Sequence, residues 1–221
     1  TVWAAQGQDD PPANRVVDDF ENDSVGEPPG NWFFITSGGK VWTPERAREP
    51  GEQIFVAEED GNRFLRFITE GEAQRYSQRN GEEFEWRLQQ HPRLQWQWRA
   101  HTLPEGASEK DKNDAGAALY VTFERDWLGR PKSIKYTYSS SLPVGTVVKD
   151  GPLYVIVVDS AQEPRMGTWK TVQRDIRSDY RQVFGGSPPD EPLSITLWSD
   201  TDTTGGTARV DFDDIVFLPP R

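Results

Sequence analysis

The feature that most constrains the fold of this chain is a strict alternation of apolar and polar residues in short segments separated by turns. The clearest segment is RLQWQWRAHTL (residues 93–103), in which Leu94, Trp96, Trp98 and Ala100 share one face. Successive side chains of a β-strand point to opposite faces of its sheet, so this period predicts a half-buried strand. Because large aromatic side chains dominate cores, we expect Trp96 and Trp98 to lie on the core face.

Similar segments predict about ten strands and one helix. The strand segments are residues 15–21, a hairpin over 53–71 with its turn at 58–62, 83–89, 93–103, 117–127, 133–139, 151–160, 168–176, 193–200 and 208–218. A helix is predicted near residues 175–184, where Ile176, Tyr180, Val183 and Phe184 have helical spacing and Gly185 suits the C-cap. The pattern predicts an all-β fold, a single two-sheet β-sandwich of the jelly-roll, lectin-like type.

Composition limits the domain organisation and the partners. The 221 residues suit a flexible N-terminal segment over 1–14 and one β-sandwich domain over 15–221. The net charge of -11, without a basic stripe, argues against nucleic acid. Cysteine is absent, which excludes disulfides and thiolate metal sites, and no apolar run approaches the ~18 residues of a membrane span. Ala4 and Ala5 fit the remnant of a signal-peptide cleavage region, which predicts a secreted or periplasmic protein, although an ordinary flexible terminus gives the same pattern.

A polar sheet face is the first candidate ligand site. Each sheet of a sandwich has one apolar inner face, so the opposite face of the same strands meets solvent. Sugar hydroxyls and acidic sugar groups suit such a surface, because hydroxyls donate and accept hydrogen bonds and arginine holds carboxylate or sulfate groups. The alternative is a plain wet sheet face. The residues assigned to this face are Gln95, Gln97, Arg99, Tyr120, Thr122, Glu124, Lys135, Thr137, Lys170 and Arg174.

The segment SDTDTT (residues 199–204) is the second candidate. Asp200 and Asp202 with a following threonine can present oxygens to one cation, but the longer EF-hand loop with its final glutamate is missing. The alternative is a turn stabilised by local side-chain to backbone hydrogen bonds. Trp198 and Asp200 alternate onto one face, which predicts that Asp200 shares a surface with a tryptophan that stacks on a ligand.

Four segments together resemble a known family. They are HPRLQWQWRAHTLPEGASEKDKNDAGAALYVTFE, SIKYTYSSSLPVGT, WKTVQRDIRSDYRQVFG and SITLWSDTDTTGGTARVDFDDIVF. Over roughly residues 18–217 the chain is similar to the bacterial domain-of-unknown-function family 3047, and this resemblance implies an exported bacterial domain. Asn113 and Asp114 fit the family pattern as a ligand-contact tip or a loop-closing turn. Arg174, Asp179 and Tyr180 fit it as an ion pair anchoring the helix and a core tyrosine.

The two ends of the chain resemble a wider class. DDFE (residues 18–21) and DFDDIVF (residues 211–217) are similar to the first and last strands of jelly-roll carbohydrate-binding modules, where these strands lie side by side and often hold a structural Ca²⁺. By this resemblance Asp19, Glu21, Asp213 and Asp214 are the candidate metal ligands, since Ca²⁺ takes six to eight hard oxygen atoms. Asp214 breaks the alternation, which indicates a bulge. The alternative is a solvated acidic edge that blocks strand pairing.

Three functions remain open. The first is an exported carbohydrate-binding β-sandwich that takes a polysaccharide or oligosaccharide, with a structural Ca²⁺. The second is a polysaccharide lyase or glycoside hydrolase. A glycoside hydrolase of this fold often carries its two catalytic carboxylates in one strand as E-x-D-x-E, and the sequence lacks this string. A lyase of this fold would use His or Tyr with Arg and Gln. The residues available for these roles are His91 or His101, Tyr120 or Tyr136, Arg99 and Gln97. The third is an envelope interaction domain without a small ligand. The oligomeric state is not determined by the sequence.

Overall fold

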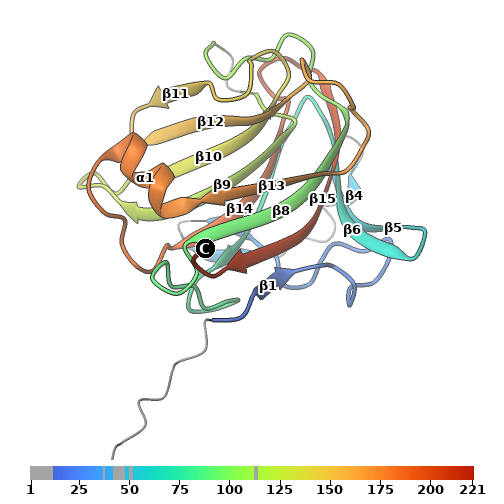
Figure 1. Cartoon of the computed structure of the whole chain (residues 1–221). Helices are drawn as coiled ribbons and strands as arrows, with labels where there is room; N and C mark the ends of the chain where they lie inside the picture. The colour runs from blue at the N-terminus through green and yellow to red at the C-terminus, as the bar shows by residue number, and fades with distance from the viewer. Residues whose placement is uncertain (1–11, 37, 42–47, 50–51, 112–113) are drawn as a thin grey trace, which may run out of the picture.

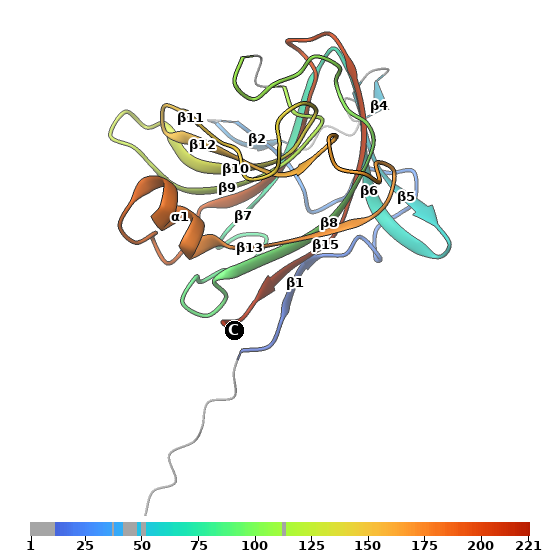
Figure 2. The same cartoon turned by 45° about the horizontal axis from the view of Figure 1, so that its top comes forward.

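The computed structural model describes residues 12–36, 38–41, 48–49, 52–111 and 114–221, and two β-sheets face each other in it (Figure 1). The first sheet has, in spatial order, β13 (Lys170–Asp175), β8 (Arg93–Thr102), β15 (Thr207–Leu218), β6 (Asn62–Glu70), β5 (Glu52–Glu59) and β4 (Arg48–Glu49). The second sheet has β11 (Val147–Asp150), β12 (Leu153–Ser160), β10 (Pro131–Ser139), β9 (Ala117–Arg125), β14 (Ser194–Asp200) and β7 (Ala73–Arg79). Figure 2 shows the two sheets as separate layers.

Four elements complete the described structure. A small hairpin is formed by β2 (Phe34–Thr36) and β3 (Gly39–Val41), and α1 spans Ile176–Phe184. β1 (Arg15–Asp18) pairs with β15, so the first and last strands lie side by side as predicted. The pairing of β10 with β12 is parallel, whereas the other named strand pairs are antiparallel. The architecture confirms an all-β, two-sheet jelly-roll sandwich with one short helix.

The core lies between the sheets and is rich in aromatic side chains. Trp96 and Trp98 of β8 are fully buried, which confirms the predicted core face of this strand. They pack across the core on Tyr136 and Tyr138 of β10, with ring centroids 5.6 Å apart in both pairs. Burying an aromatic side chain of this kind stabilises the fold by about 1.5–3 kcal/mol, so the few large rings compensate for the modest apolar content.

Residues 83–89, predicted as a strand, form no strand. Phe84, Trp86 and Leu88 are buried as their alternation suggests, and Trp86 stacks on Phe217 with ring centroids 4.2 Å apart. The backbone groups of this segment bond to the Asn80 side chain and to loop backbone, such as Leu88 N to Asp190 O (2.8 Å), and form no strand ladder. Asn80 Nδ2 donates to Trp86 O (2.8 Å), and Trp86 N donates to Asn80 Oδ1 (2.8 Å). An alternating apolar pattern here reflects packing on the core without sheet pairing.

The described residues contain more strands than the ten predicted. β2, β3, β4 and β11 are two to four residues long, too short to show an alternating pattern. β7 has the sequence AQRYSQR, which is polar and carries no such signal, although Gln74, Tyr76 and Gln78 are buried in it. These strands are held by pairing with distant segments, which local patterns do not show.

The observed position of α1 confirms the helix predicted near residues 175–184. Asp175 is the N-cap, and its side chain accepts a hydrogen bond from Ser178 N at 2.9 Å. Gly185 follows the last turn with φ 75°, and its N–H donates to Arg181 O at 3.0 Å. Arg174 anchors the helix through Asp179, with Nη2 2.6 Å from Oδ1, and Tyr180 lies in the core as predicted. No helix in the described residues has the length and apolar composition that crossing a lipid bilayer requires.

Candidate functional site

A groove of about 850 Å³ lies over the outer face of the second sheet. Its floor is formed by the side chains of β7, β14 and β9 that point away from the core, and the β2–β3 hairpin borders one side. This volume is within the range of ordinary ligand sites. The residues that line the groove are Ile35, Thr36, Gly38, Gly39, Arg75, Ser77, Arg79, Asn80, Glu82, Tyr120, Thr122, Arg125, Pro131, Ser133, Leu153, Leu193, Ser194, Thr196, Trp198 and Asp200.

Four side chains form a row of stacked groups across the groove. The rings of Tyr120 and Trp198 stack with centroids 5.1 Å apart and 30° between their planes. On the side of β7, the Arg75 guanidinium lies 5.2 Å from the Trp198 ring centroid and 5.0 Å from that of Phe34. Because β9 and β7 flank β14 on opposite sides, Tyr120 and Arg75 approach Trp198 from opposite sides. Trp198 therefore offers the groove its edge, not the free face expected of a sugar-stacking platform.

Hydroxyl groups make up much of the remaining floor. Ser77 Oγ and Thr196 Oγ1 are 2.6 Å apart across β7 and β14, and Thr122 Oγ1 and Ser133 Oγ are 2.9 Å apart across β9 and β10. Each hydroxyl in these pairs keeps hydrogen-bonding capacity beyond the one contact, because it has one donor and two acceptor lone pairs. The floor can therefore donate hydrogen bonds to a polar ligand and accept hydrogen bonds from it.

An acidic cluster closes one end of the groove. Carboxylate oxygens of Asp114, Asp200 and Asp202 lie within 4.8 Å of one another, a spacing at which three ligand atoms could hold a metal ion. Asp200 lines the groove, while Asp114 is buried and accepts hydrogen bonds from Thr203 N (3.2 Å) and Thr204 N (2.7 Å). Sequence reasoning assigned these three residues to ligand binding, and the structure brings them together beside Tyr120 and Trp198. Asn113, assigned with them, lies outside the described residues.

Burial and charge shift the ionisable groups at this end. Burial, followed by the carboxylates of Asp202 and Asp114, raises the pKa of Asp200 to about 6. Lys135 is fully buried nearby, and burial lowers its pKa to about 8 against the opposing effect of Asp200, Glu109 and Asp114. Burial, and next the Asp200 charge, raise the pKa of the Tyr120 hydroxyl far above its ordinary value. Tyr120 is therefore neutral, and perturbed groups of this kind are typical of functional sites.

Three other residues assigned to the ligand site lie elsewhere. The polar face was assigned as one surface, but β8 and β13 belong to the first sheet while β9, β10 and β14 belong to the second. Gln97 donates from Nε2 to Asp214 Oδ2 at 2.6 Å, Arg99 faces Asp211, and Arg174 is bound to Asp179. Alternation along each strand assigned these side chains to a face without indicating which sheet the strand would join.

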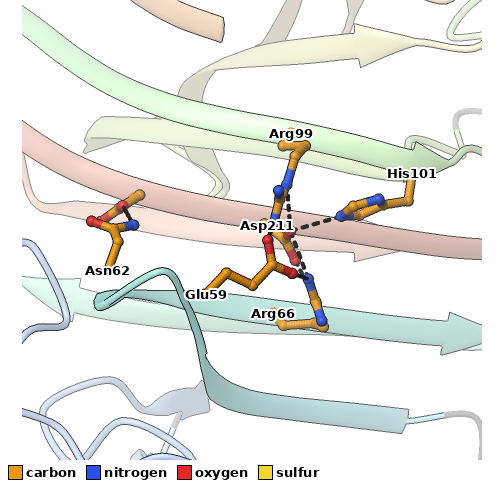
Figure 3. Close-up of polar contacts among 7 residues, drawn as sticks. Glu59, Asn62, Arg66, Arg99, His101 and Asp211 are labelled. Atoms are coloured by element: carbon orange, nitrogen blue, oxygen red, sulfur yellow. Dashed lines mark hydrogen bonds and ion pairs between the residues drawn. The ribbon is translucent and has the colours of Figure 1, made fainter. Parts of the chain in front are cut away.

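Arg99 belongs to a buried charge network on the outer face of the first sheet. Figure 3 shows Arg66, Arg99 and His101 converging on Asp211, with Glu59 beside both arginines. Asp211 is fully buried, and its carboxylate accepts from Arg66 Nε (2.7 Å), Arg99 Nη2 (2.7 Å) and His101 Nε2 (2.8 Å). These donors hold the pKa of Asp211 below its ordinary value although burial opposes them. Sequence analysis did not identify Asp211 as the centre of this network.

The four predicted calcium ligands lie close enough to interact. Burial is the main cause that raises the pKa of Asp213 to about 7, and the carboxylates of Asp214 and Glu21 raise it further. Burial and then Asp19 raise the pKa of Asp214. Asp214 has φ 47° at a register shift of β15, which confirms the predicted bulge. Among the described residues, three carboxylates within 4.8 Å occur at Asp114, Asp200 and Asp202 rather than here, so calcium at this position stays a prediction.

Comparison with known proteins gives a family and distant structural likenesses. Residues 40–216 match the family described as "Protein of unknown function (DUF3047)", and no curated protein matches the chain. The family 30 carbohydrate-binding module of a Clostridium thermocellum cellulosomal cellulase is 13% identical over 94% of this chain and 98% of that chain, with a TM-score of 0.46. The xyloglucanase domain of NopAA from Sinorhizobium fredii is 12% identical over 81% of this chain and 91% of that chain, with a TM-score of 0.40. Likenesses at this level carry no functional argument, so function rests on the residues of the groove.

Proposed function

The chain belongs to the DUF3047 family, and we propose that its groove over the second sheet binds an oligosaccharide or polysaccharide. The observation that carries this proposal is the composition of one continuous surface. Serine and threonine hydroxyls, arginine donors and the edges of an aromatic pair line the same groove. Sugars present many hydroxyls, each a donor and an acceptor, together with apolar C–H groups, and this lining complements both.

Binding is tested by titrating the protein with soluble neutral and acidic polysaccharides in a calorimeter. We expect Trp198→Ala to weaken binding at least about tenfold, because it removes the ring against which both Tyr120 and Arg75 are ordered. The matched control is Trp127→Ala, since Trp127 is 89% exposed and does not line the groove. No binding to any polysaccharide would contradict the proposal and would favour an envelope interaction domain without a small ligand.

A polysaccharide-degrading enzyme is the second candidate, and Asp200 is the observation that favours it. A carboxyl group with a pKa near 6, at the end of a groove and beside two further carboxylates, suits a general acid. The test measures new reducing ends, and absorbance from unsaturated uronates, after incubation with each polysaccharide that binds. Turnover that Asp200→Asn abolishes while binding persists would establish the enzyme, whereas binding without products would establish the binding domain.

Calcium and export are further parts of the proposal. The acidic cluster around Asp200 and the predicted set around Asp214 are two separate positions for Ca²⁺. We expect Ca²⁺ added to metal-free protein to raise the melting temperature, and loss of this rise in Asp200→Asn or in Asp214→Asn identifies the position. An unchanged melting temperature with no metal in elemental analysis would reject calcium. Export is proposed with a cell-wall or extracellular polysaccharide as the ligand, since such polymers lie outside the cytoplasm, and fractionation of producing cells checks it.

A further inference from the structure

We propose that the groove selects an anionic polysaccharide, one that carries carboxylate or sulfate groups along its chain. This inference rests on the proposed carbohydrate binding and names its ligand class. Three arginines line the groove, Arg75, Arg79 and Arg125, against two acidic residues, Glu82 and Asp200. The chain as a whole has the opposite balance, with 36 acidic residues against 25 basic ones. Arg79 is paired with Glu82 (Nη2 to Oε2, 2.5 Å), and Asp200 belongs to the acidic cluster at one end of the groove. Among the described lining residues, Arg75 and Arg125 are therefore the positive charges without a carboxylate partner, and they attract anions to their part of the groove.

Two of these arginines, Arg75 and Arg125, have donors available for a ligand. Within the part of the chain that the structure describes, Arg75 and Arg125 form no ion pair with a carboxylate, in contrast to Arg66, Arg99 and Arg174. Arg75 is exposed, and its guanidinium carbon lies over the rings of Phe34 and Trp198, 5.0 Å and 5.2 Å from their centroids. Arg125 uses Nη1 to donate to Gly129 O at 2.9 Å. A guanidinium that contacts aromatic rings instead of carboxylates can use its N–H groups for bidentate contact with a carboxylate or sulfate of a ligand.

The positions of the arginines favour a polymer with repeated charges over a single small anion. Arg75 and Arg79 are four residues apart on β7, which separates them by about 13 Å along the strand. Ser194 of β14 is the register partner of Arg79 on β7 and of Thr122 on β9. Arg79 therefore lies at the same end of the groove as the end of β9 that carries Arg125. The acidic cluster of Asp114, Asp200 and Asp202 lies at the other end. Anionic groups of one chain would thus meet Arg75 and, nearer one end, Arg125, beside the ion pair of Arg79 with Glu82.

Single-stranded nucleic acid is the other anionic polymer to consider, and the structure disfavours it. Bases bind such grooves mainly by stacking on free aromatic faces. Tyr120 and Arg75 approach the Trp198 ring from opposite sides, so this ring offers no free face on which a base could stack. An anionic polysaccharide needs hydrogen-bond donors for its carboxylate or sulfate groups and partners for its hydroxyls, but it needs no free aromatic face.

The test compares polymers that share a backbone and differ in charge. Polygalacturonate is titrated beside its fully methyl-esterified form, and dextran sulfate beside dextran, in low salt and in 0.5 M NaCl. We expect the charged member of at least one pair to bind about tenfold tighter than its neutral partner in low salt, and this preference to shrink in high salt. The pair that shows the preference distinguishes a carboxylate from a sulfate ligand.

Two variants assign the preference to the groove. Arg75→Gln and Arg125→Gln should each lower the affinity for the charged polymer about fivefold or more, and by a larger factor than they lower that for the neutral polymer. Within the described residues the Arg125 side chain makes one hydrogen bond, to Gly129 O, so its variant does not depend on the ring stack. Arg209→Gln is the control, because it makes the same charge change at an exposed position of β15 in the first sheet.

Each outcome bears on the inference. Equal binding of charged and neutral polymers, or an equal loss in Arg209→Gln, would overturn it while carbohydrate binding stands. Tighter binding of a single-stranded oligonucleotide than of either charged polysaccharide would also overturn it. Absence of binding to all four polysaccharides would reject the proposed function as well, so the two failures are distinguishable.

Discussion

Arg99 Nη2 lies 2.7 Å from Asp211 Oδ2, and the carboxylate that it contacts is fully buried on the outer face of the first sheet. The two residues are 112 positions apart in the chain and meet because β8 pairs with β15 with Asp211 opposite Arg99. Arg66 reaches the same carboxylate from β6, on the other side of β15. The Asp211 carboxylate on β15 therefore connects β6, β8 and β15 (Figure 3).

Neutralising Asp211 should destabilise the protein. Asp211→Asn leaves two nearly buried guanidiniums with only half-exposed Glu59 as a charged partner, and removal of one member of a buried ion pair costs about 3 kcal/mol. Urea unfolding at pH 7 measures the loss, with Arg209→Gln as an exposed control on the same strand. Because the pKa of Asp211 is lowered by folding, its stabilisation is present above its unfolded pKa and disappears as pH falls through its folded pKa. A loss below about 1 kcal/mol would show that the network is dispensable.

Removing the charge of Asp214 should stabilise the protein near neutral pH. Asp213, Asp214 and Glu21 repel one another, and the pKa of Asp213 is about 7. A carboxyl whose pKa is raised by folding binds its proton more tightly when folded, so stability falls as pH rises from 5 to 7.5. Asp214→Asn retains an acceptor for Gln97 and suits φ 47°, because asparagine tolerates this region. In metal-free buffer, Asp214→Asn should raise the urea midpoint of unfolding more at pH 7.5 than at pH 5. An equal rise at both pH values would contradict repulsion among these carboxylates.

A methyl group at Gly116 should disturb the loop that carries Asp114. A Cβ there would lie 2.7 Å from Leu103 Cδ2, 2.9 Å from Pro104 Cδ and 3.2 Å from Ala208 Cβ. Overpacking of this kind costs about 1–3 kcal/mol, and we expect Gly116→Ala to lower the free energy of unfolding by that amount. Gly30→Ala is the matched control, since a Cβ at Gly30 meets nothing within 4 Å. Equal stability of the two variants would show that the Leu103 and Pro104 contacts relax freely.

Affinity for an anionic ligand should depend on pH through Asp200. Between pH 5 and pH 7 Asp200 loses its proton, since its pKa is about 6, and the groove gains a negative charge at one end. Dextran sulfate keeps its charge over this range, so its affinity should fall as pH rises. Asp200→Asn should flatten this dependence, whereas Glu85→Gln, an exposed acid outside the groove lining, should not. A pH dependence that survives in Asp200→Asn would assign the titration to another group.

Local patterns were sufficient for the elements whose signals lie within one segment. The period of two in residues 93–103 predicted the β8 strand and its buried tryptophans, and helical spacing with Gly185 predicted α1 and its end. The Asp214 bulge and the contact of Arg174 with Asp179 were also anticipated, because each depends on neighbours within a few residues. The same signal failed at residues 83–89, where buried alternating side chains pack on the core without a partner strand.

Tertiary structure alone decided which polar residues share a surface. The alternation in β8 and in β9 is equally clear, yet Arg99 faces Asp211 on one sheet and Tyr120 faces Trp198 on the other. Arg75 and Arg79 reach the groove from a polar strand without a strand signal. The physical reason is that a period of two sets the face of a side chain within its own strand, whereas neighbours across a sheet are set by pairing between distant segments. The sequence determined the sandwich and its core, and strand order determined the groove.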